Sequence, residues 1–135
     1  GTWLDQKATI TFVSNRTGNN DIYTMTTDGG NIVNVTNNTA NDLNPVISGN
    51  NMIAFTSNRS GNNEVYTMNG DGTNLINLTN NPANDSYPFF SPDSTSIAYT
   101  TDRNGNDELY IINTNGQNNY NFTRNPAQDF LPAWR

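Results

Sequence analysis

The side chains of this sequence that could take part in chemistry are carboxylates, arginines and amides, because it contains no histidine and no cysteine. Twelve acidic residues stand against six basic ones, which gives a net charge of -6. Without histidine the commonest general base and metal ligand is missing, and without cysteine there is neither a thiol nucleophile nor a disulfide. Catalysis would therefore depend on a pair of carboxylates, as in glycosidases.

Arginine and aspartate recur at intervals of 43 and 44 residues: Arg16, Arg59 and Arg103, and Asp42, Asp85 and Asp129. Gathered on one face, they would form a polar rim that binds a peptide, a glycan or a cation, with carboxylates as acceptors and guanidinium groups as two-pronged donors. Equivalent carboxylates give no reason for two of them to differ in pKa, which acid–base catalysis requires. The series therefore predicts binding and no catalytic residue.

The same series also has a structural interpretation. Each arginine would pair with the acidic residue that opens the next strand, Asp21, Glu64 or Glu108, and each aspartate would cap the amides of its own loop. A residue present once per repeat usually serves the repeat, so this interpretation is favoured. Residues that break the repeat are then better candidates for specific binding, namely Asn41, Tyr87, Arg124 and Phe130.

A repeat of the whole sequence positions these residues. "SNRTGNNDIYTM" from Ser14 returns as "SNRSGNNEVYTM" from Ser57 and as "TDRNGNDELYII" from Thr101. The same spacing relates three further series: Tyr23, Tyr66 and Tyr110; Thr36, Thr79 and Thr123; Pro45, Pro88 and Pro132. A period of 40 to 45 residues is typical of propeller blades. The sequence predicts one domain over 1–135, with repeat units at approximately 4–47, 48–90 and 91–134.

Each unit predicts four short antiparallel strands, because apolar or β-branched runs alternate with Asn, Gly, Asp and Pro, and no helical period is present. Three series of strands are expected: 8–14, 52–57 and 96–101; 21–25, 64–68 and 108–112; 31–36, 74–79 and 118–123. A fourth series begins at the three prolines. Tight hairpin turns are expected at Asp28-Gly29, Asp71-Gly72 and Asn115-Gly116. The loop before each strand of the second series and the loop that leads to the fourth series would meet at one end of the blades.

The unit "NPANDSYPFFSPDSTSIAYTTDRNGNDELYIINTNGQNNYNFTRNPAQD" resembles the WD40-like Pro-Asp repeat of TolB-type β-propellers. Two departures concern a turn: the first unit lacks the Pro-Asp pair, and Ser94 stands where the family has glycine after Asp93. The resemblance implies a propeller, six-bladed and periplasmic in TolB, that acts by binding other proteins. It also implies a periplasmic or secreted location. Related propellers occur within hydrolases and lyases, so an enzyme fragment is the alternative.

Three blades cannot close a ring, since propellers ordinarily have four to eight. The expected fold is all-β, a β-propeller half of three four-stranded antiparallel blades that completes a six-bladed ring as a homodimer. The expected interface joins Thr9, Ile10, Thr11, Phe12 and Val13 of one chain to Phe130, Leu131, Pro132, Ala133 and Trp134 of the other. A fragment of a longer propeller and an open filament are the alternatives.

The expected function is a non-catalytic scaffold that assembles by strand exchange and presents a loop face rich in asparagine to a protein or another ligand. The alternative is a fragment or accessory propeller of a hydrolase or polysaccharide lyase, and a purely structural half-ring is a third possibility. No basic run suggests a nucleic acid partner, and no apolar stretch approaches the ~20 residues of a membrane span. "NGDGTN" from Asn69 lacks the spacing of a calcium loop, and no cofactor is expected.

Overall fold

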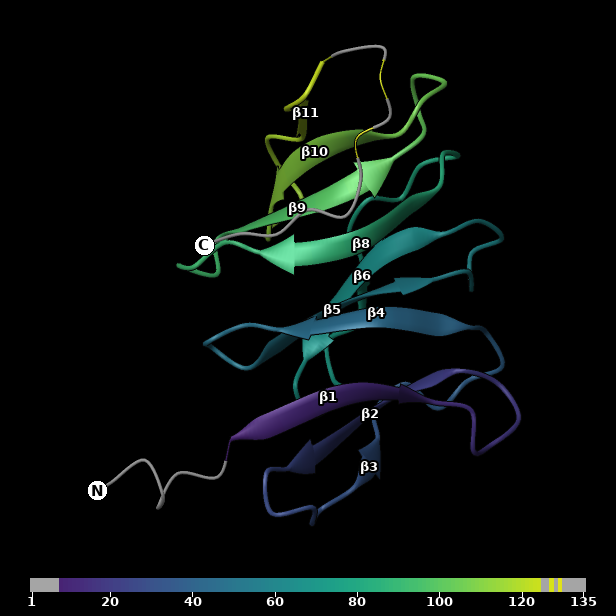
Figure 1. Ribbon diagram of the computed structural model, residues 1–135, viewed down its shortest axis with the longest axis vertical. Helices are drawn as coiled ribbons and strands as arrows, with labels where there is room; N and C mark the ends of the chain where they lie inside the picture. Colours follow the sequence, from purple (N-terminus) through teal and green to yellow (C-terminus); the bar gives the residue numbers. More distant parts are fainter. Residues whose placement is uncertain (1–7, 125–126, 128, 130–135) are drawn as a thin grey trace.

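The structure is a computed structural model that describes residues 8–124, 127 and 129. It consists of three antiparallel sheets that follow one another along the longest axis of the molecule (Figure 1). The first sheet holds β1 (Thr9–Ser14), β2 (Asp21–Thr26) and β3 (Val33–Asn34). The second holds β4 (Asp42–Ile47), β5 (Met52–Ser57), β6 (Glu64–Asn69) and β7 (Ile76–Asn77). The third holds β8 (Asp85–Phe90), β9 (Ser96–Thr101), β10 (Glu108–Asn113) and β11 (Tyr120–Asn121).

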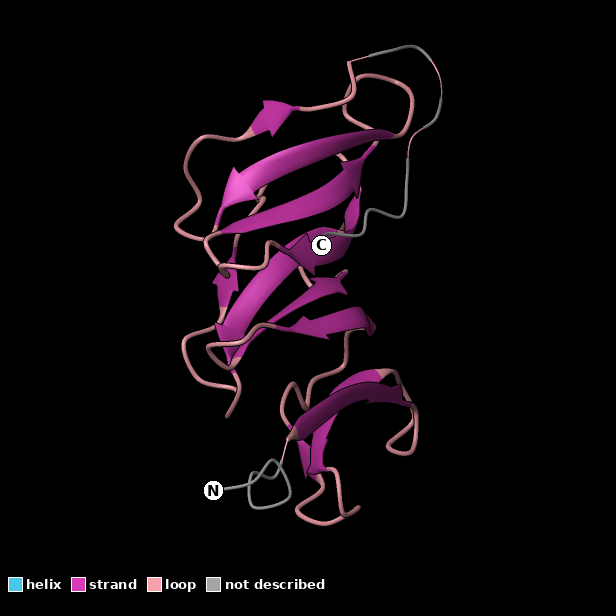
Figure 2. Ribbon diagram, turned by 60° about the vertical axis from the view of Figure 1, so that its left-hand side comes forward, coloured by secondary structure: helices cyan, strands magenta, loops and turns pink. Residues whose placement is uncertain are grey.

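All regular structure among the described residues is strand, as Figure 2 shows, so the all-β prediction is confirmed. The second and third sheets have the four strands expected of a propeller blade, in sequential order. The first sheet has three, and β1 is its edge strand among the described residues. Each complete sheet takes its first strand from the end of one sequence repeat and the other three from the next. Sheets and sequence repeats are therefore offset by one strand.

An aromatic pair joins β1 to β2, β5 to β6 and β9 to β10. Phe12 lies opposite Tyr23, Phe55 opposite Tyr66 and Tyr99 opposite Tyr110. Their ring centroids are 5.6, 5.8 and 6.1 Å apart. Such cross-strand pairs stabilise a sheet by roughly 0.2–1 kcal/mol each, and the repeat supplies one to every blade.

The outer strands are shorter than predicted, two residues each instead of about six. Two features of the repeat shorten them. Asn31, Asn74 and Asn118 have φ of 52°, 56° and 55°, outside the extended region, just before each strand. After it, the side-chain oxygen of Asn34 accepts a hydrogen bond from the Asn37 N–H at 2.9 Å, which turns the chain away from the sheet. The sequence pattern showed the apolar alternation but not this competition from asparagine side chains.

The prediction that the prolines begin the strands of the fourth series is wrong. Pro45 and Pro88 are the fourth residues of β4 and β8, and the pairing register shifts around each of them. A bulge leaves a residue outside the ladder, so the missing N–H of proline costs no hydrogen bond there. Pro132 lies outside the described residues.

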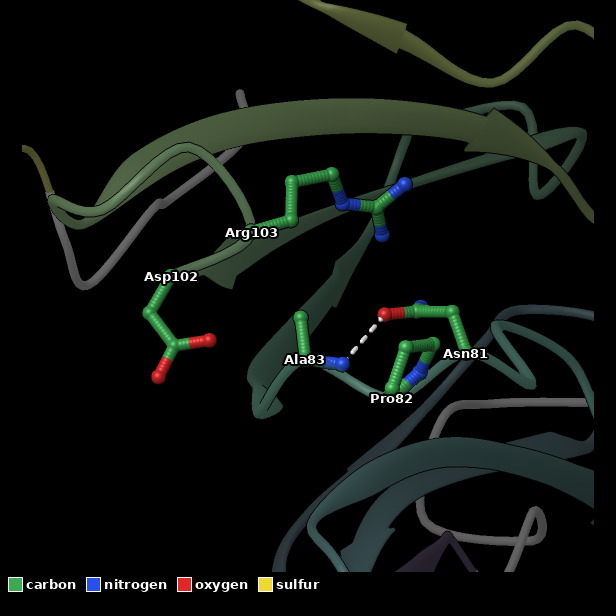
Figure 3. A pocket seen from close by; sticks show the side chains of 5 residues that line it. All are labelled: Asn81, Pro82, Ala83, Asp102 and Arg103. Atoms are coloured by element: carbon green, nitrogen blue, oxygen red, sulfur yellow. Dashed lines mark hydrogen bonds between the residues drawn. The ribbon is translucent and has the colours of Figure 1, made fainter.

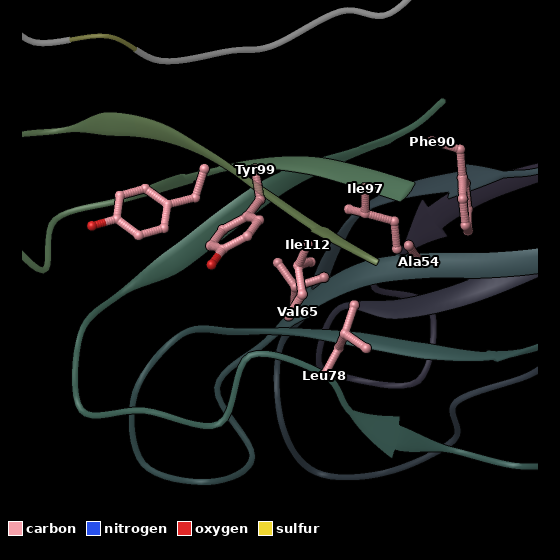
Figure 4. Packing of buried hydrophobic residues seen from close by; sticks show 8 residues of the cluster. Ala54, Val65, Leu78, Phe90, Ile97, Tyr99 and Ile112 are labelled. Atoms are coloured by element: carbon pink, nitrogen blue, oxygen red, sulfur yellow. The ribbon is translucent and has the colours of Figure 1, made fainter. Parts of the chain in front are cut away.

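The core lies between successive sheets. One buried cluster joins the second and third sheets: Ala54, Val65, Leu78, Phe90, Ile97, Tyr99, Tyr110 and Ile112 (Figure 4). The other joins the first and second: Ile22, Ile53, Phe55, Tyr66 and Met68. At both junctions the second strand of one blade packs against the first strand of the next, β1 against β4 and β5 against β8. Face-to-face stacking of the blades therefore holds the molecule together.

Candidate functional site

The long loops of the repeat lie together at one end of the sheets, as predicted. Asn62 Nδ2 donates to the carbonyl oxygens of Asn81 and Ala83, at 2.9 and 2.6 Å. The equivalent Asn19 donates to the carbonyls of Asn38 and Ala40, at 2.7 Å each. An asparagine in each loop within a sheet therefore binds the loop that leads to the next sheet. We call this surface the loop face; it comprises residues 15–20, 37–41, 58–63, 80–84 and 102–107.

The arginines of the loop face stack on the aromatic pair of their own sheet. The Arg59 guanidinium carbon lies 5.5 and 5.0 Å from the ring centroids of Phe55 and Tyr66, within cation–π range. Its Nη2 also donates to both carboxylate oxygens of Asp42, at 3.1 and 3.0 Å. Arg103 repeats the arrangement: it stacks on Tyr99 and Tyr110 and its Nη2 lies 3.4 Å from each carboxylate oxygen of Asp85. The arginines thus join the first three strands of a blade.

The expected pairing of arginine with the acidic residue that opens the next strand is wrong. Glu64 instead accepts hydrogen bonds from the Asn62 side chain at 3.1 Å, the Thr79 hydroxyl at 2.6 Å and the Asn81 N–H at 2.8 Å. Asp21 has equivalent partners in the first sheet. These carboxylates accept the backbone N–H groups of the loop, whereas the aspartates of the fourth series accept side-chain amides of their own loops. The two side chains point in different directions. The arginine lies over the aromatic rings and points to the first strand of its sheet, whereas Glu64 or Asp21 points to the loop that leads to the next sheet.

The aspartates of the loop face are engaged within the protein. The side chains of Asp42 and Asp85 are fully buried. Besides its arginine, Asp42 accepts a hydrogen bond from Asn38 Nδ2 at 2.8 Å, and Asn81 gives Asp85 the same contact. Because both oxygens already have donors, neither carboxylate is open to a ligand.

Asp21 makes the stability of the first sheet depend on acidity. Burial by itself raises the pKa of this carboxyl, but hydrogen bonds from Asn34, Thr17, the Asn38 N–H and Thr36 outweigh it and hold the pKa below its ordinary value. A lowered folded-state pKa stabilises the fold above the unfolded-state value of about 4, and this contribution is lost as the pH falls through the folded-state pKa.

We therefore expect the Asp21→Asn variant to be less stable than the wild type at neutral pH, and the difference to narrow as the pH falls below about 4. Urea unfolding at a series of pH values measures both quantities. A difference between the two chains that stays constant down to about pH 2 would contradict this assignment.

Two equivalent pockets lie where one blade meets the next on the loop face. In Figure 3, residues 81–83 of the connecting loop face Asp102 and Arg103 around a cavity of about 440 Å³. The other is lined by residues 38–40 with Asn58 and Arg59 and has a volume of about 420 Å³. The pocket wall is held in shape from within, because the Ala83 N–H donates to Asn81 Oδ1 at 2.8 Å. The repeat thus offers one polar pocket per blade junction, each with an arginine at its edge.

The candidate residues that break the repeat have different roles. Asn41 is structural, since its Oδ1 accepts the Asn20 N–H at 3.3 Å. Arg124, at φ 51°, donates through Nε to the carbonyl of Asn121 at 3.0 Å and so binds its own turn. Tyr87 is 40% exposed, and its φ of 55° is unusual for an aromatic residue. Phe130 lies outside the described residues. Tyr87 is therefore the exposed aromatic side chain of this group.

Asp129 continues the aspartate series in backbone position. Its N–H donates to the carbonyl of Asp107 at 2.6 Å, as the N–H of Asp85 does to Asn63 and that of Asp42 does to Asn20. Asp129 is half-buried, whereas the other two aspartates are fully buried. The chain at Asp129 therefore takes the position in which β4 and β8 begin.

A groove that the sequence did not reveal lies between β1 and the first strands of the second and third sheets. It has a volume of about 470 Å³ and is lined by Thr9, Ile10, Thr11, Pro45, Val46, Ile47, Phe89 and Phe90, from β1, β4 and β8. We call it the inner groove. Its three segments lie far apart in the sequence, and the only signal for it was the repeated proline strand.

The edge of β1 is uncovered where its counterparts are buried. Ile10 is 39% exposed, whereas the equivalent Ile53 and Ile97 are fully buried. The hydroxyl oxygen of Thr11 is buried without a hydrogen-bond partner in the described part of the chain. β4 pairs with the edge of β5, and β8 pairs with the edge of β9. Among the described strands none pairs with the corresponding edge of β1.

The chemistry available within the described residues is limited. No group of three or more acidic side chains among them is placed to hold a metal ion. Burial raises the pKa of the Tyr99 hydroxyl despite the opposing effect of Arg103, so this buried phenol stays neutral. Within the same residues no helix is long and apolar enough to cross a bilayer.

Solved structures with the same fold include two TolB proteins. The TolB of Acinetobacter baumannii matches with a TM-score of 0.81 and 21% identity over 93% of this chain and 32% of the other. A putative TolB from Agrobacterium tumefaciens matches with a TM-score of 0.76 and 20% identity over 84% of this chain and 44% of the other. An oligogalacturonate lyase in complex with manganese matches with a TM-score of 0.61 and 16% identity, over 82% and 32%. This chain thus spans less than half the length of each.

No curated protein matches the sequence. A family model does, over residues 48–135, and its description is the TolB beta propeller domain. The matched segment begins after β4 and includes the other three strands of the second sheet and the whole third sheet, with Arg59, Arg103, Asp85 and Pro88 of the repeat. The chain belongs to the TolB β-propeller domain family.

Proposed function

We propose that this chain is a non-catalytic scaffold of TolB type that closes a six-bladed ring with a second copy and binds a protein or peptide on its loop face. Residues 130–134 of each copy would pair with β1 of the other and complete its first blade. The family membership supports a periplasmic or secreted location for such a ring.

The uncovered edge of β1 carries this proposal. An exposed edge strand with apolar side chains is an aggregation hazard that proteins cover. An added strand would give the backbone of β1 its missing partners, and the blade of the other copy would cover Ile10 as the first sheet covers Ile53. The apolar side chains of the added strand would meet Val46 and Phe89 in the inner groove. The segment 129–134, "DFLPAW", has the length and the Asp and Pro positions of β4 and β8, so it fits this place.

The test is the solution mass by light scattering after size exclusion, over about a hundredfold dilution. We expect twice the chain mass of 14.9 kDa. The Ile10→Asp variant should reduce the mass to one chain, because it places a charge in the joint. Ile32→Asp is the matched control, since Ile32 is exposed just before β3, which β2 separates from β1. A wild-type mass of 14.9 kDa at every concentration would overturn the closed ring.

The loop face is suited to an extended ligand. The two polar pockets repeat at successive blade junctions, so a ring would present a series of them around its mouth. Titration of the ring with a library of immobilised peptides tests this half of the proposal, and absence of binding to any peptide would contradict it.

An accessory propeller of a hydrolase or polysaccharide lyase is the second candidate, favoured by the fold similarity to the manganese-bound oligogalacturonate lyase. Asp42 and Asp85 already accept hydrogen bonds from an arginine and an asparagine, which disfavours catalysis by these carboxylates. An assay for unsaturated products from oligogalacturonate with added manganese separates a catalytic fragment of a lyase from the scaffold, because only the lyase would release them.

A further inference from the structure

The ion pairs of the loop face join residues that lie far apart in the sequence of one blade. In the second and third sheets the arginine follows the second strand and its aspartate begins the first strand, as in Arg59 with Asp42 and Arg103 with Asp85. The aromatic pair beneath each guanidinium fixes its direction toward the first strand. In both complete blades, an arginine that stacks on aromatic side chains of the second and third strands therefore forms an ion pair with an aspartate of the first strand.

Arg16 has the same setting without the carboxylate. Its guanidinium carbon lies 4.6 Å from the Tyr23 ring centroid and 5.7 Å from that of Phe12, and its Nε donates to Ser14 Oγ at 2.9 Å. No carboxylate forms an ion pair with it in the described part of the chain. Arg16 is exposed, whereas Arg59 and Arg103 are half-buried. The rings of Phe12 and Tyr23 and the Ser14 hydroxyl thus hold the guanidinium at the edge of β1, where it can pair with a carboxylate.

Asp129 is the residue of this sequence that matches such a group. Its backbone follows the same hydrogen-bond pattern as Asp42 and Asp85, and it is the third member of their series. Its backbone bond to Asp107 places it beside the third sheet, whereas Arg16 belongs to the first (Figure 1). The two sheets lie at opposite ends of the molecule with the second between them. A pair between these two residues therefore requires two chains.

We infer that Arg16 of one copy and Asp129 of a second copy form the ion pair that fixes the register of the completed blade. This inference rests on the proposed ring, in which the pair occurs twice. In that ring, residues 130–134 of one copy would supply apolar contact along β1 of the other, and the ion pair would fix where this pairing begins. A slip of one residue would turn the side chains of this segment to the wrong face and move the carboxylate away from the guanidinium.

Charge reversal and mixing test the inference. Arg16→Glu and Asp129→Lys each place like charges at both joints of a homodimer, so each variant should raise the dimer dissociation constant by about 30-fold or more. An equal mixture of the two variants should restore the constant to within about threefold of the wild type, because one joint of the heterodimer then holds the reversed pair and the other holds the original pair. Arg124→Glu, which changes the charge equally but whose side chain binds its own turn, is the control in both measurements.

Light scattering over a dilution series reads each outcome. If each variant alone forms a weak dimer and the mixture of the two regains the wild-type dissociation constant, the ion pair between copies is established. A wild-type dimer that Arg16→Glu weakens no more than Arg124→Glu would overturn the pair and leave the ring in place. Two weak variants that fail to recover when mixed would overturn the contact between chains. A monomeric wild type would overturn the ring and the pair together.

Discussion

Replacing Phe55 by alanine is expected to lower the free energy of unfolding by about 3–5 kcal/mol, a large part of the stability of a domain of this size. Phe55 is fully buried between the first and second sheets, stacks on Tyr66 and lies beneath Arg59. Its removal leaves a cavity and takes away one of the two rings on which the arginine stacks. Urea unfolding followed by circular dichroism measures the loss.

Phe12 provides the comparison, because it occupies the same place in the first sheet but is half-buried. In a single chain, Phe12→Ala should cost clearly less than Phe55→Ala. In a closed ring the last blade of the other copy would pack against Phe12 as the first sheet packs against Phe55, and the two losses should become similar at concentrations where the dimer persists. Equal losses in a chain shown to be monomeric would contradict the burial on which this expectation depends.

The second large effect is expected at Glu64, where alanine should cost about 3 kcal/mol or more. The carboxylate is buried and accepts three hydrogen bonds, from the Asn62 side chain, the Thr79 hydroxyl and the Asn81 N–H. Alanine would leave all three donors without this acceptor in a place of low solvent access. The loop that leads to the third sheet would lose its attachment, and the pocket beside Arg103 would lose its wall.

The midpoint of thermal unfolding measures this change, and amide exchange of residues 80–84 locates it. Asp71→Ala is the matched control, since it also removes a carboxylate but from an exposed hairpin turn where its partner Thr73 can bind water. Loss of protection confined to the hairpin, or equal midpoints for the two variants, would show that Glu64 does not hold the loop.

The position of the arginines on one loop face was predictable from the sequence, but the partners of their side chains were not. The interval between Arg59 and Arg103 placed both on one loop face, since equivalent residues of stacked blades point the same way. Which carboxylate each arginine meets depended on the direction of its side chain over the rings, and sequence spacing favoured the wrong one. The inner groove was not predictable at all, because it exists only where β1 meets the first strands of the two following sheets.

By itself the sequence determined the repeat, the central strands and the turns. Those features depend on local chemistry: alternating apolar residues form strands, and Asp-Gly pairs form tight turns, as at Gly29 and Gly72 with φ of 82° and 87°. The tertiary structure alone decided the bulges at Pro45 and Pro88, the burial of Asp42 and the exposure of Ile10. These depend on which strand lies beside which, a long-range choice made by the stacking of whole blades. An internal repeat places equivalent residues in every blade, and only their neighbours in space decide which of these residues is buried and which is exposed.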